Sequence, residues 1–197
     1  TWTATVEADD ALLCEDKAAD ATCSRVIDAP GDPENLAWKG TATQSSTNWD
    51  GTADRGNDGV TDGAFWNGSV THTLDADASP WWQVDLGDTY ELDRIVLWNR
   101  TDSCGTYPCG ARLTDFRVMV LDGAANEVWG EDFFTDGVGY PDPALGGLEI
   151  PLPEGTEGRT VHVQILGPNQ VDTPLGTIAI LSLAEVEVFR AGSTQEP

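Results

Sequence analysis

Three basic side chains stand out in a strongly acidic chain. His72, Arg100 and Arg112 lie in one stretch of a sequence that has 10 Lys+Arg against 34 Asp+Glu. Arginine presents several donors in a rigid fork, and a neutral imidazole can donate or accept, so such groups converge well on adjacent hydroxyl groups. We interpret the three residues as a ligand site and the rest of the chain as its scaffold.

Each of these residues also has a purely structural explanation. His72 could be a strand-end histidine bonded to a carbonyl group, and the two arginines could pair with neighbouring carboxylates. The other histidine, His162, stands between two valines and is expected on the solvent side of a strand. Alternation along a strand likewise predicts one of Trp81 and Trp82 inside and the other at the sandwich edge.

The net charge argues against two classes of partner. At −24, the chain would repel nucleic acid and anionic membranes over most of its surface. No apolar run approaches the ~18 residues of a membrane span. A chain of 197 residues suits one domain with a real core and a small appendage. We therefore predict neither a nucleic-acid partner nor a membrane partner.

The four cysteines form two locally spaced pairs. Four cysteines allow three pairings, and the simplest joins Cys14 to Cys23 and Cys104 to Cys109. A zinc site would need further thiolates or a histidine close to a pair, and neither histidine lies close in sequence. We predict two disulfides, an oxidising compartment and secretion.

The chain divides into three parts by composition and residue pattern. Residues 1–34 are acidic and alanine-rich, and a Pro-Gly-Asp-Pro segment near their end indicates a boundary. We expect an extension that is closed by its own disulfide and packed on the main domain, because it is too short for a core of its own. Residues 35–190 are rich in short Val, Ile, Trp and Phe runs between turn residues, typical of an all-β antiparallel sandwich. Residues 191–197 form a polar tail. The expected strands span 81–86, 92–98, 116–121, 127–129, 148–152, 161–166 and 178–189.

One loop has the composition of a weak cation site. The segment 56–63, Gly-Asn-Asp-Gly-Val-Thr-Asp-Gly, offers carboxylate, amide and carbonyl oxygens, which Ca²⁺ prefers. Its glycines permit tight turns. Such sequences are also common as plain turns, so the loop alone leaves both interpretations open.

A set of motifs resembles the F-type lectin (fucolectin) domain, within the wider discoidin or coagulation-factor type C group. The resemblance covers residues 35 to about 190. The motif Pro80-Trp-Trp-Gln-Val-Asp-Leu-Gly87 indicates only the wider group, whereas Gly68-Ser-Val-Thr-His-Thr73 and Asn99-Arg-Thr-Asp102 are much more specific to the lectins. The other matching segments are Asn35-Leu-Ala37, Ala42-Thr-Gln-Ser-Ser46, Asn57-Asp-Gly59 and Leu183-Ala-Glu-Val-Glu-Val188.

The resemblance implies a jelly-roll β-sandwich whose loops bind L-fucose. It maps His72 and Arg100 onto sugar-binding residues and Asp102 onto the acid that orients the basic pair, with Arg112 as the candidate for the second basic residue. Aromatic side chains could supply an apolar wall for the sugar's methyl and ring C–H groups. The candidates for this wall are Phe65, Trp66 and Tyr107.

The resemblance also implies a structural Ca²⁺. The implied ligands are the side chains of Asp58, Ser69 and Glu185 and backbone carbonyls near Arg55, Val60 and Ala184. Glu185 is far from the others in sequence, as expected for a cation that joins the end of the chain to a loop.

The sequence departs from the family pattern at one place. The pattern is Arg-x-Asp followed four residues later by Arg or Lys, often with two adjacent cysteines between. Here nine residues, Ser103 to Ala111, separate Asp102 from Arg112, and Cys104 and Cys109 are expected to close a small loop instead.

Three classes of function were weighed. We expect a non-catalytic lectin for fucose-containing glycans, either free or as one module of a larger secreted protein. A discoidin-type module for another glycan or a protein is the alternative. A glycan-active enzyme is less favoured, because no hydrolase motif is present and many acidic residues make accidental carboxylate pairs unavoidable.

Overall fold

The described residues form an antiparallel β-sandwich, which confirms the expected fold class. The computed structural model describes residues 34–75, 77–105, 107–134, 147–167 and 179–192. These residues all belong to one of the two units into which the chain divides, Gly31–Pro197. The predicted extension with Cys14 and Cys23 and most of the predicted tail lie outside the described residues, so these expectations stay predictions.

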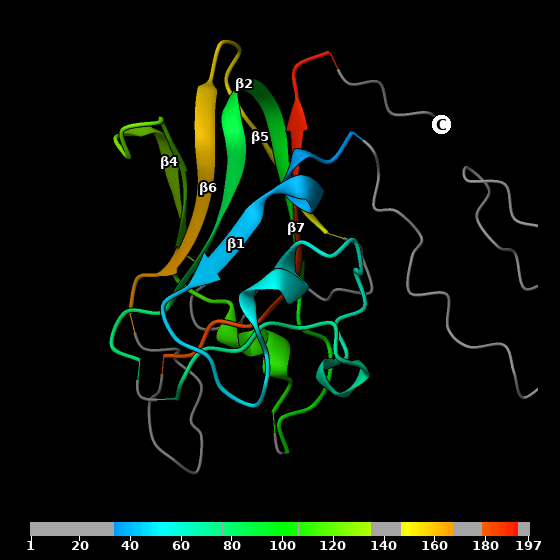
Figure 1. Cartoon of the computed structure of the whole chain (residues 1–197). Helices are drawn as coiled ribbons and strands as arrows, with labels where there is room; N and C mark the ends of the chain where they lie inside the picture. Colours follow the sequence, from blue (N-terminus) through cyan, green and yellow to red (C-terminus); the bar gives the residue numbers. More distant parts are fainter. Residues whose placement is uncertain (1–33, 76, 106, 135–146, 168–178, 193–197) are drawn as a thin grey trace, which may run out of the picture. The chain divides into compact units, whose positions relative to one another are not determined.

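Strands dominate the described chain, with short 3₁₀ helices between them (Figure 1). Within this part of the chain, no helix has the length and hydropathy that a membrane span requires. The elements are η1 Leu36–Lys39, β1 Thr41–Gln44, η2 Ala53–Gly56, η3 Phe65–Asn67, β2 Trp81–Asn99, η4 Cys109–Arg112, β3 Phe116–Leu121, β4 Glu127–Phe133, β5 Leu148–Pro151, β6 Glu157–Ile165 and β7 Leu183–Arg190.

The long strand β2 belongs to both layers of the sandwich. Its first part pairs with β1 and β6 in the order β1-β2-β6-β3-β4, and its second part pairs with β5 and β7. The register with β6 shifts between Asp85 and Tyr90, where Gly87 has φ of 86°, a conformation that glycine adopts without strain. The two runs expected as separate strands, 81–86 and 92–98, are therefore one element.

Alternating apolar residues fill the space between the layers. In β2, Trp82 and Val84 are buried while Trp81 is half-buried, as the period of two predicts. His162 lies on the opposite face of β6 from its buried valine neighbours, and its ring stacks on Trp81 at a centroid distance of 5.4 Å. Core residues of the other strands are Phe116, Val118, Val120, Ile150, Val161, Val163, Val186 and Val188.

Several elements differ from the sequence expectations, and β6, expected from 161, already begins at Glu157. β1 was not expected, because its Thr-Ala-Thr-Gln sequence is largely polar and only partly buried. β4 continues to Phe133, and β7 begins at Leu183 rather than at 178. The residues just before β7 are apolar and buried, yet they bond to the loop around Thr71 and Thr73 rather than to a strand. Apolar runs predict burial more reliably than they predict strand ends.

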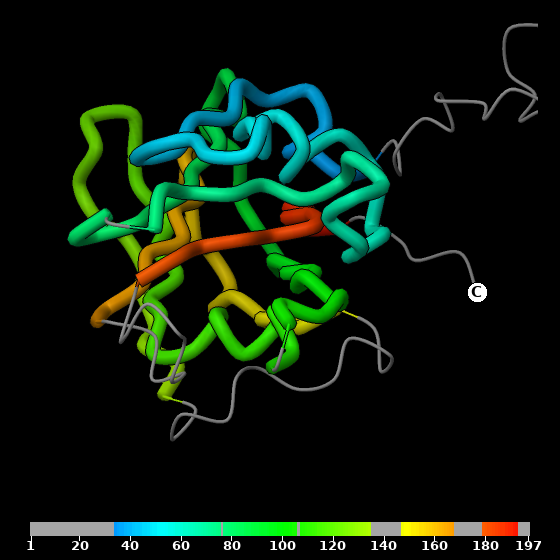
Figure 2. Tube along the Cα trace, turned by 90° about the horizontal axis from the view of Figure 1, so that it is seen from below, coloured from blue at the N-terminus to red at the C-terminus, as the bar shows by residue number. Residues whose placement is uncertain are grey.

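The loops that carry the motif residues lie at one end of the strands. In Figure 1 the helices η2, η3 and η4 gather at the bottom of the sandwich, and Figure 2 looks onto this end. Connecting loops of a rigid β-sandwich commonly carry binding residues. The candidate site therefore lies at this end of the molecule.

Candidate functional site

His72 is held by main-chain hydrogen bonds on both sides. Its N–H donates to the Gly51 carbonyl at 2.9 Å, and its own carbonyl accepts from Asn48 at 2.9 Å. The preceding residue bonds to the first residue of β7: Thr71 N donates to Leu183 O at 2.8 Å, and the Thr71 hydroxyl accepts from Leu183 N at 2.9 Å. The backbone at His72 is therefore fixed independently of the side chain.

The His72 imidazole is neutral, and its contacts determine the tautomer. Nε2 lies 3.1 Å from Nη1 of Arg112, and Nδ1 lies 2.6 Å from the Thr73 carbonyl. Because arginine only donates, Nε2 must accept, which leaves Nδ1 as the donor to Thr73. Burial lowers the pKa of His72 to about 4; the Thr73 carbonyl opposes this shift, and the charges of Arg112 and Arg100 add to it.

Arg100 directly follows β2, and two contacts orient it. Its backbone N–H donates to Oδ1 of Asn99 at 2.7 Å. Its guanidinium donates through Nε and Nη2 to the two oxygens of Asp102, at 2.5 and 3.1 Å. The same group lies over the Phe65 ring, 4.6 Å from its centroid. Arg100 is only 5% exposed, so this bidentate pair fixes a partly desolvated charge.

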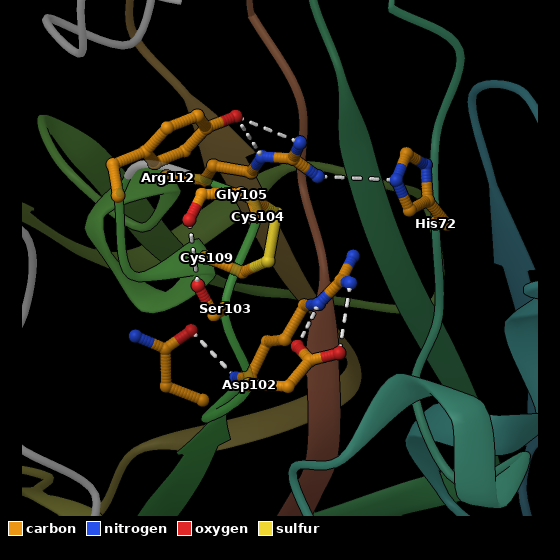
Figure 3. Close-up of a disulfide and its surroundings, with 10 residues drawn as sticks. His72, Asp102, Ser103, Cys104, Gly105, Cys109 and Arg112 are labelled. Carbon is orange, nitrogen blue, oxygen red and sulfur yellow. Dashed lines mark hydrogen bonds and ion pairs between the residues drawn. A yellow bond between two sulfur atoms is a disulfide. The ribbon is translucent and has the colours of Figure 1, made fainter.

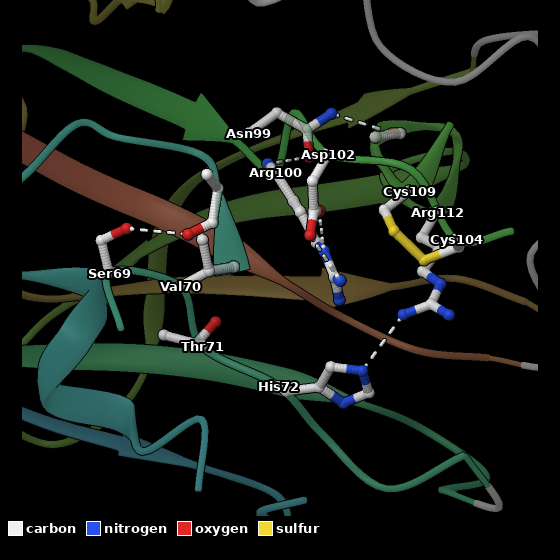
Figure 4. A network of polar contacts seen from close by, with 12 residues as sticks. Ser69, Val70, Thr71, His72, Asn99, Arg100, Asp102, Cys104, Cys109 and Arg112 are labelled. Atoms are coloured by element: carbon white, nitrogen blue, oxygen red, sulfur yellow. Dashed lines mark hydrogen bonds and ion pairs between the residues drawn. A yellow bond between two sulfur atoms is a disulfide. The ribbon is translucent and has the colours of Figure 1, made fainter. Parts of the chain in front are cut away.

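Arg112, the last residue of η4, reaches His72 although nine residues separate it from Asp102 (Figure 3). Its Nε and Nη2 donate to the Tyr107 hydroxyl at 3.3 and 2.9 Å. Figure 4 shows His72, Arg100 and Arg112 from three separate segments with their polar ends turned toward one region. The structure thus brings together the three residues that the sequence singled out.

An exposed aromatic surface borders the basic residues. The Phe65 ring packs edge-on against His72, with centroids 5.5 Å apart, and Trp66 packs edge-on against Phe65 at 5.3 Å. Phe65 is buried, whereas Trp66 is 78% exposed. A polar cluster beside an exposed indole suits a ligand with hydroxyl groups on one side and C–H groups on another. Tyr107, expected in this apolar wall, uses its hydroxyl to contact Arg112.

One of the predicted metal ligands, Glu185, is a buried carboxylate. Glu185 in β7 is 0% exposed, and its Oε1 accepts from Gly59 N at 3.2 Å. Its Oε2 is buried and has no hydrogen-bond partner among the described residues. Burial and the nearby Asp58 carboxylate raise the pKa of Glu185 to about 8. A buried oxygen of this kind, near a second carboxylate, fits a bound cation.

The remaining predicted ligands would each offer an oxygen atom to a cation. The register of β7 against β2 leaves Ala184 as an extra residue between Leu183 and Glu185, a bulge in which a carbonyl need not take part in the ladder. Ser69 Oγ donates to the Asp62 carbonyl, and the side chain of Arg55 donates to the Val70 carbonyl at 3.4 Å. The Val60 N–H donates to Asp58 at 2.9 Å.

This donor set suits a hard cation. Among the described residues no group of three or more His, Cys, Asp or Glu could hold a metal alone. The predicted set has only two carboxylates, and Ca²⁺ commonly completes such a set with carbonyl, hydroxyl and water oxygens. The residues therefore fit the implied ion, and its binding remains a proposal.

The chain matches a known family model and several characterised relatives. The model described as a NedA-like, galactose-binding domain matches residues 55–163. Fucolectin of Anguilla anguilla is 32% identical over 162 residues, which is 79% of this chain and 90% of that protein. The chain belongs to the fucolectin family. Fucolectin-6 of Anguilla japonica is 42% identical over 85 residues, a match that spans only 41% of this chain and 45% of that relative.

A solved lectin domain shares the fold. The lectin domain of lectinolysin, in a structure with Lewis B antigen, superposes with a TM-score of 0.65 and 36% identity. The match covers 82% of this chain and 99% of that domain.

The structure places two residues of this candidate site in roles that the sequence did not reveal. Asn99 anchors both Arg100 N and, through Nδ2, the Gly110 carbonyl at 2.9 Å, so it ties the end of β2 to η4. Tyr107 provides the acceptor for Arg112. For Asn99 the motif Asn99-Arg-Thr-Asp102 was a signal, whereas nothing in the sequence indicated a hydrogen bond from Arg112 to Tyr107.

Proposed function

We propose that this chain is a lectin for L-fucose or fucosylated glycans. The proposal depends on one observation: a neutral imidazole and two oriented guanidinium groups converge beside an exposed indole. The family membership supports it, as does the likeness to the lectinolysin domain bound to a fucosylated antigen.

The polar groups would recognise the sugar hydroxyls. Nε2 of His72 can accept from a hydroxyl, while Arg100 and Arg112 can donate to its oxygen, so one hydroxyl could be held from both sides. An axial hydroxyl entering between His72 and Arg112 would replace their direct contact. A sugar that lacks this hydroxyl would not gain these hydrogen bonds, which is a basis for discrimination.

The apolar face of the sugar would lie against Trp66. L-Fucose carries a methyl group where hexoses carry a hydroxymethyl group, and an indole face offers contact area for methyl and C–H groups. Phe65 would support this surface from below, since it packs against Trp66, His72 and Arg100.

Titration calorimetry with L-fucose tests the site. His72→Ala and Arg100→Lys should each weaken binding by more than about tenfold, because each removes a hydrogen bond made in a partly buried, charged site. His162→Ala is the matched control, since His162 lies on the outer face of β6. Unaltered affinity in either site variant would remove that residue from the site, and an absence of fucose binding by the wild-type chain would refute the function.

We further propose that Ca²⁺ bound at Glu185 and Asp58 stabilises the fold. A cation would satisfy the buried Glu185 Oε2 and join β7 to the loop around Gly59. If Ca²⁺ binds only the folded state, a concentration of 100 Kd should stabilise the protein by about 2.7 kcal/mol. Thermal unfolding with CaCl₂ and with a chelator measures this difference.

Two variants sharpen the calcium experiment. Glu185→Gln should abolish the calcium-dependent rise in Tm, whereas Glu131→Gln, on exposed β4, should retain it. Direct calorimetric titration with CaCl₂ gives a readout independent of sugar binding. Equal Tm values in calcium and chelator for the wild type would count against the metal.

We propose that the site binds glycans without transforming them. The groups at the site are donors and an acceptor oriented for hydroxyls, and Asp102 is already engaged with Arg100. Chromogenic fucosides provide the test: hydrolysis above that of a His72→Ala control would identify an enzyme instead.

Secretion is the remaining part of the proposal. The Cys104–Cys109 disulfide suits an oxidising compartment, and the acidic surface suits an extracellular lectin, free or joined to other modules. Mass spectrometry of the native source under non-reducing conditions would detect the disulfide and any linked module.

A further inference from the structure

A small disulfide-closed loop presents Tyr107 to the site. Cys104 and Cys109 are joined, with their Cα atoms 5.0 Å apart. Inside the loop, Cys104 N donates to the Tyr107 carbonyl at 2.9 Å, and Ser103 and Pro108 form an isolated β-bridge. Cys109 N donates to the Asp102 carbonyl at 2.9 Å. The backbone of Tyr107 is therefore restrained by a covalent bond and by these local contacts.

The Tyr107 hydroxyl fixes one edge of the Arg112 guanidinium. Arg112 donates to it from both Nε and Nη2, at 3.3 and 2.9 Å, and this leaves Nη1 directed at Nε2 of His72 (Figure 3). Because the guanidinium is planar and rigid, fixing the edge formed by Nε and Nη2 also fixes the direction of the Nη1–H bonds. The position of the donor that faces His72 thus depends on a phenol five residues away.

We propose that Tyr107, held by the Cys104–Cys109 loop, is a positioning residue that sets Arg112 against His72 and thereby determines the affinity of the site for sugar. The part of this inference that concerns sugar affinity rests on the proposed fucose binding. It does not require Tyr107 to touch the sugar, and it assigns the disulfide loop a specific task, the placement of Arg112.

Such an arrangement suits the nine-residue spacing between Asp102 and Arg112. A free arginine side chain has about 2 kcal/mol of rotamer entropy, part of which would be lost each time a sugar bound. Two guanidinium groups beside one imidazole also repel each other. A neutral phenol holds Arg112 in place without adding a carboxylate beside the one that already holds Arg100. The arrangement is thus prepared before the ligand arrives, which favours affinity.

Tyr107→Phe is the direct test, because it removes the hydroxyl and keeps the ring. L-Fucose binding should weaken about tenfold, the effect expected for loss of a charged hydrogen bond that orients a donor. The His72 titration, followed by NMR, provides a readout that a merely structural role would not move. Arg112 lowers the pKa of His72, so a displaced Arg112 should let that pKa rise. Tyr90→Phe, at the bend of β2, is the matched control and should change neither the fucose affinity nor the pKa of His72.

The loop itself is tested by Cys104→Ser/Cys109→Ser in the full chain. It should shift fucose affinity and the His72 pKa in the same directions as Tyr107→Phe. Wild-type fucose affinity and an unshifted His72 pKa in Tyr107→Phe would overturn the inference. If the wild-type chain binds no fucose, the proposed function fails, and the His72 titration in Tyr107→Phe still decides whether Tyr107 positions Arg112.

Discussion

At the residue scale, the site depends on a histidine that is kept neutral. Burial favours the uncharged imidazole, and the two neighbouring guanidinium groups oppose protonation. The groups facing it are Arg112, Arg100 and Asp75, and only Asp75 carries a negative charge. A neutral His72 keeps a lone pair at Nε2, which a protonated ring would lose. The proposed sugar binding is thereby linked to pH through one residue.

The pH dependence of stability should show this link. His72 has a folded pKa of about 4 against an ordinary value of 6.5, so between these values the unfolded chain binds more protons. Stability from the neutral histidine is fully present above pH 6.5 and is lost as the pH falls toward 4, by about 3 kcal/mol. Many carboxylates also titrate near pH 4, so the quantity to measure is the difference between wild type and His72→Gln in denaturant unfolding. A difference that stays constant from pH 7 to pH 4.5 would contradict the buried, neutral assignment.

At the element scale, loops rather than strands form the site, and close packing holds those loops in place. Gly51 approaches the backbone of His72 so closely that a Cβ atom there would lie 2.6 Å from both N and Cβ of His72. The strands supply fixed ends: β2 ends at Asn99 beside Arg100, and the residues before β7 bond to Thr71 and Thr73. Mobile loops could not hold donors in register for a small sugar.

Gly51→Ala should therefore damage both folding and binding. The added methyl must displace the His72 segment, since the contacted atoms include backbone that cannot rotate away. We expect a loss of about 1 to 3 kcal/mol in unfolding free energy, typical of overpacking, and weaker fucose binding. Gly167→Ala is the control, because nothing lies within 4 Å of a Cβ there. Equal Tm and affinity in the two variants would show that the loop adapts without moving His72.

At the scale of the whole molecule, a strongly acidic chain presents a basic site. The net charge of −24 implies self-repulsion in the compact state, while the proposed ligand is a neutral sugar. Folding and binding should therefore respond differently to salt. Screening acts between surface charges, whereas hydrogen bonds to an uncharged ligand are little affected by it.

Raising NaCl from about 0.01 M to about 0.3 M should raise the Tm, because the Debye length falls below the spacing of many surface charges. The affinity for free L-fucose should change by less than about twofold over the same range. Differential scanning calorimetry and sugar titration at each salt concentration measure the two quantities. A large salt effect on fucose affinity would indicate that the ligand recognised is charged.

The sequence by itself determined the fold class and indicated the three basic residues that the structure brings together. Alternating apolar residues predict strands because side chains in a strand point to opposite faces, and this is a local property. The motifs around His72 and Arg100 are likewise short segments, and each could be recognised from the local sequence alone. Glu185 could be assigned beside the 56–63 loop only through the family resemblance, and the structure places it against Gly59.

Only the tertiary structure decided how these parts meet. The contact from Arg112 to His72 joins residues that are 40 apart in the sequence. The contact from Arg112 to the Tyr107 hydroxyl spans only five residues, but it depends on the path of the loop between them. The two apolar runs form one strand, β2, which pairs with β6 on both sides of its register shift. Residue type limits what a side chain can bond. Which partner a side chain meets depends on the path of the backbone, and the packing of the whole sandwich determines that path.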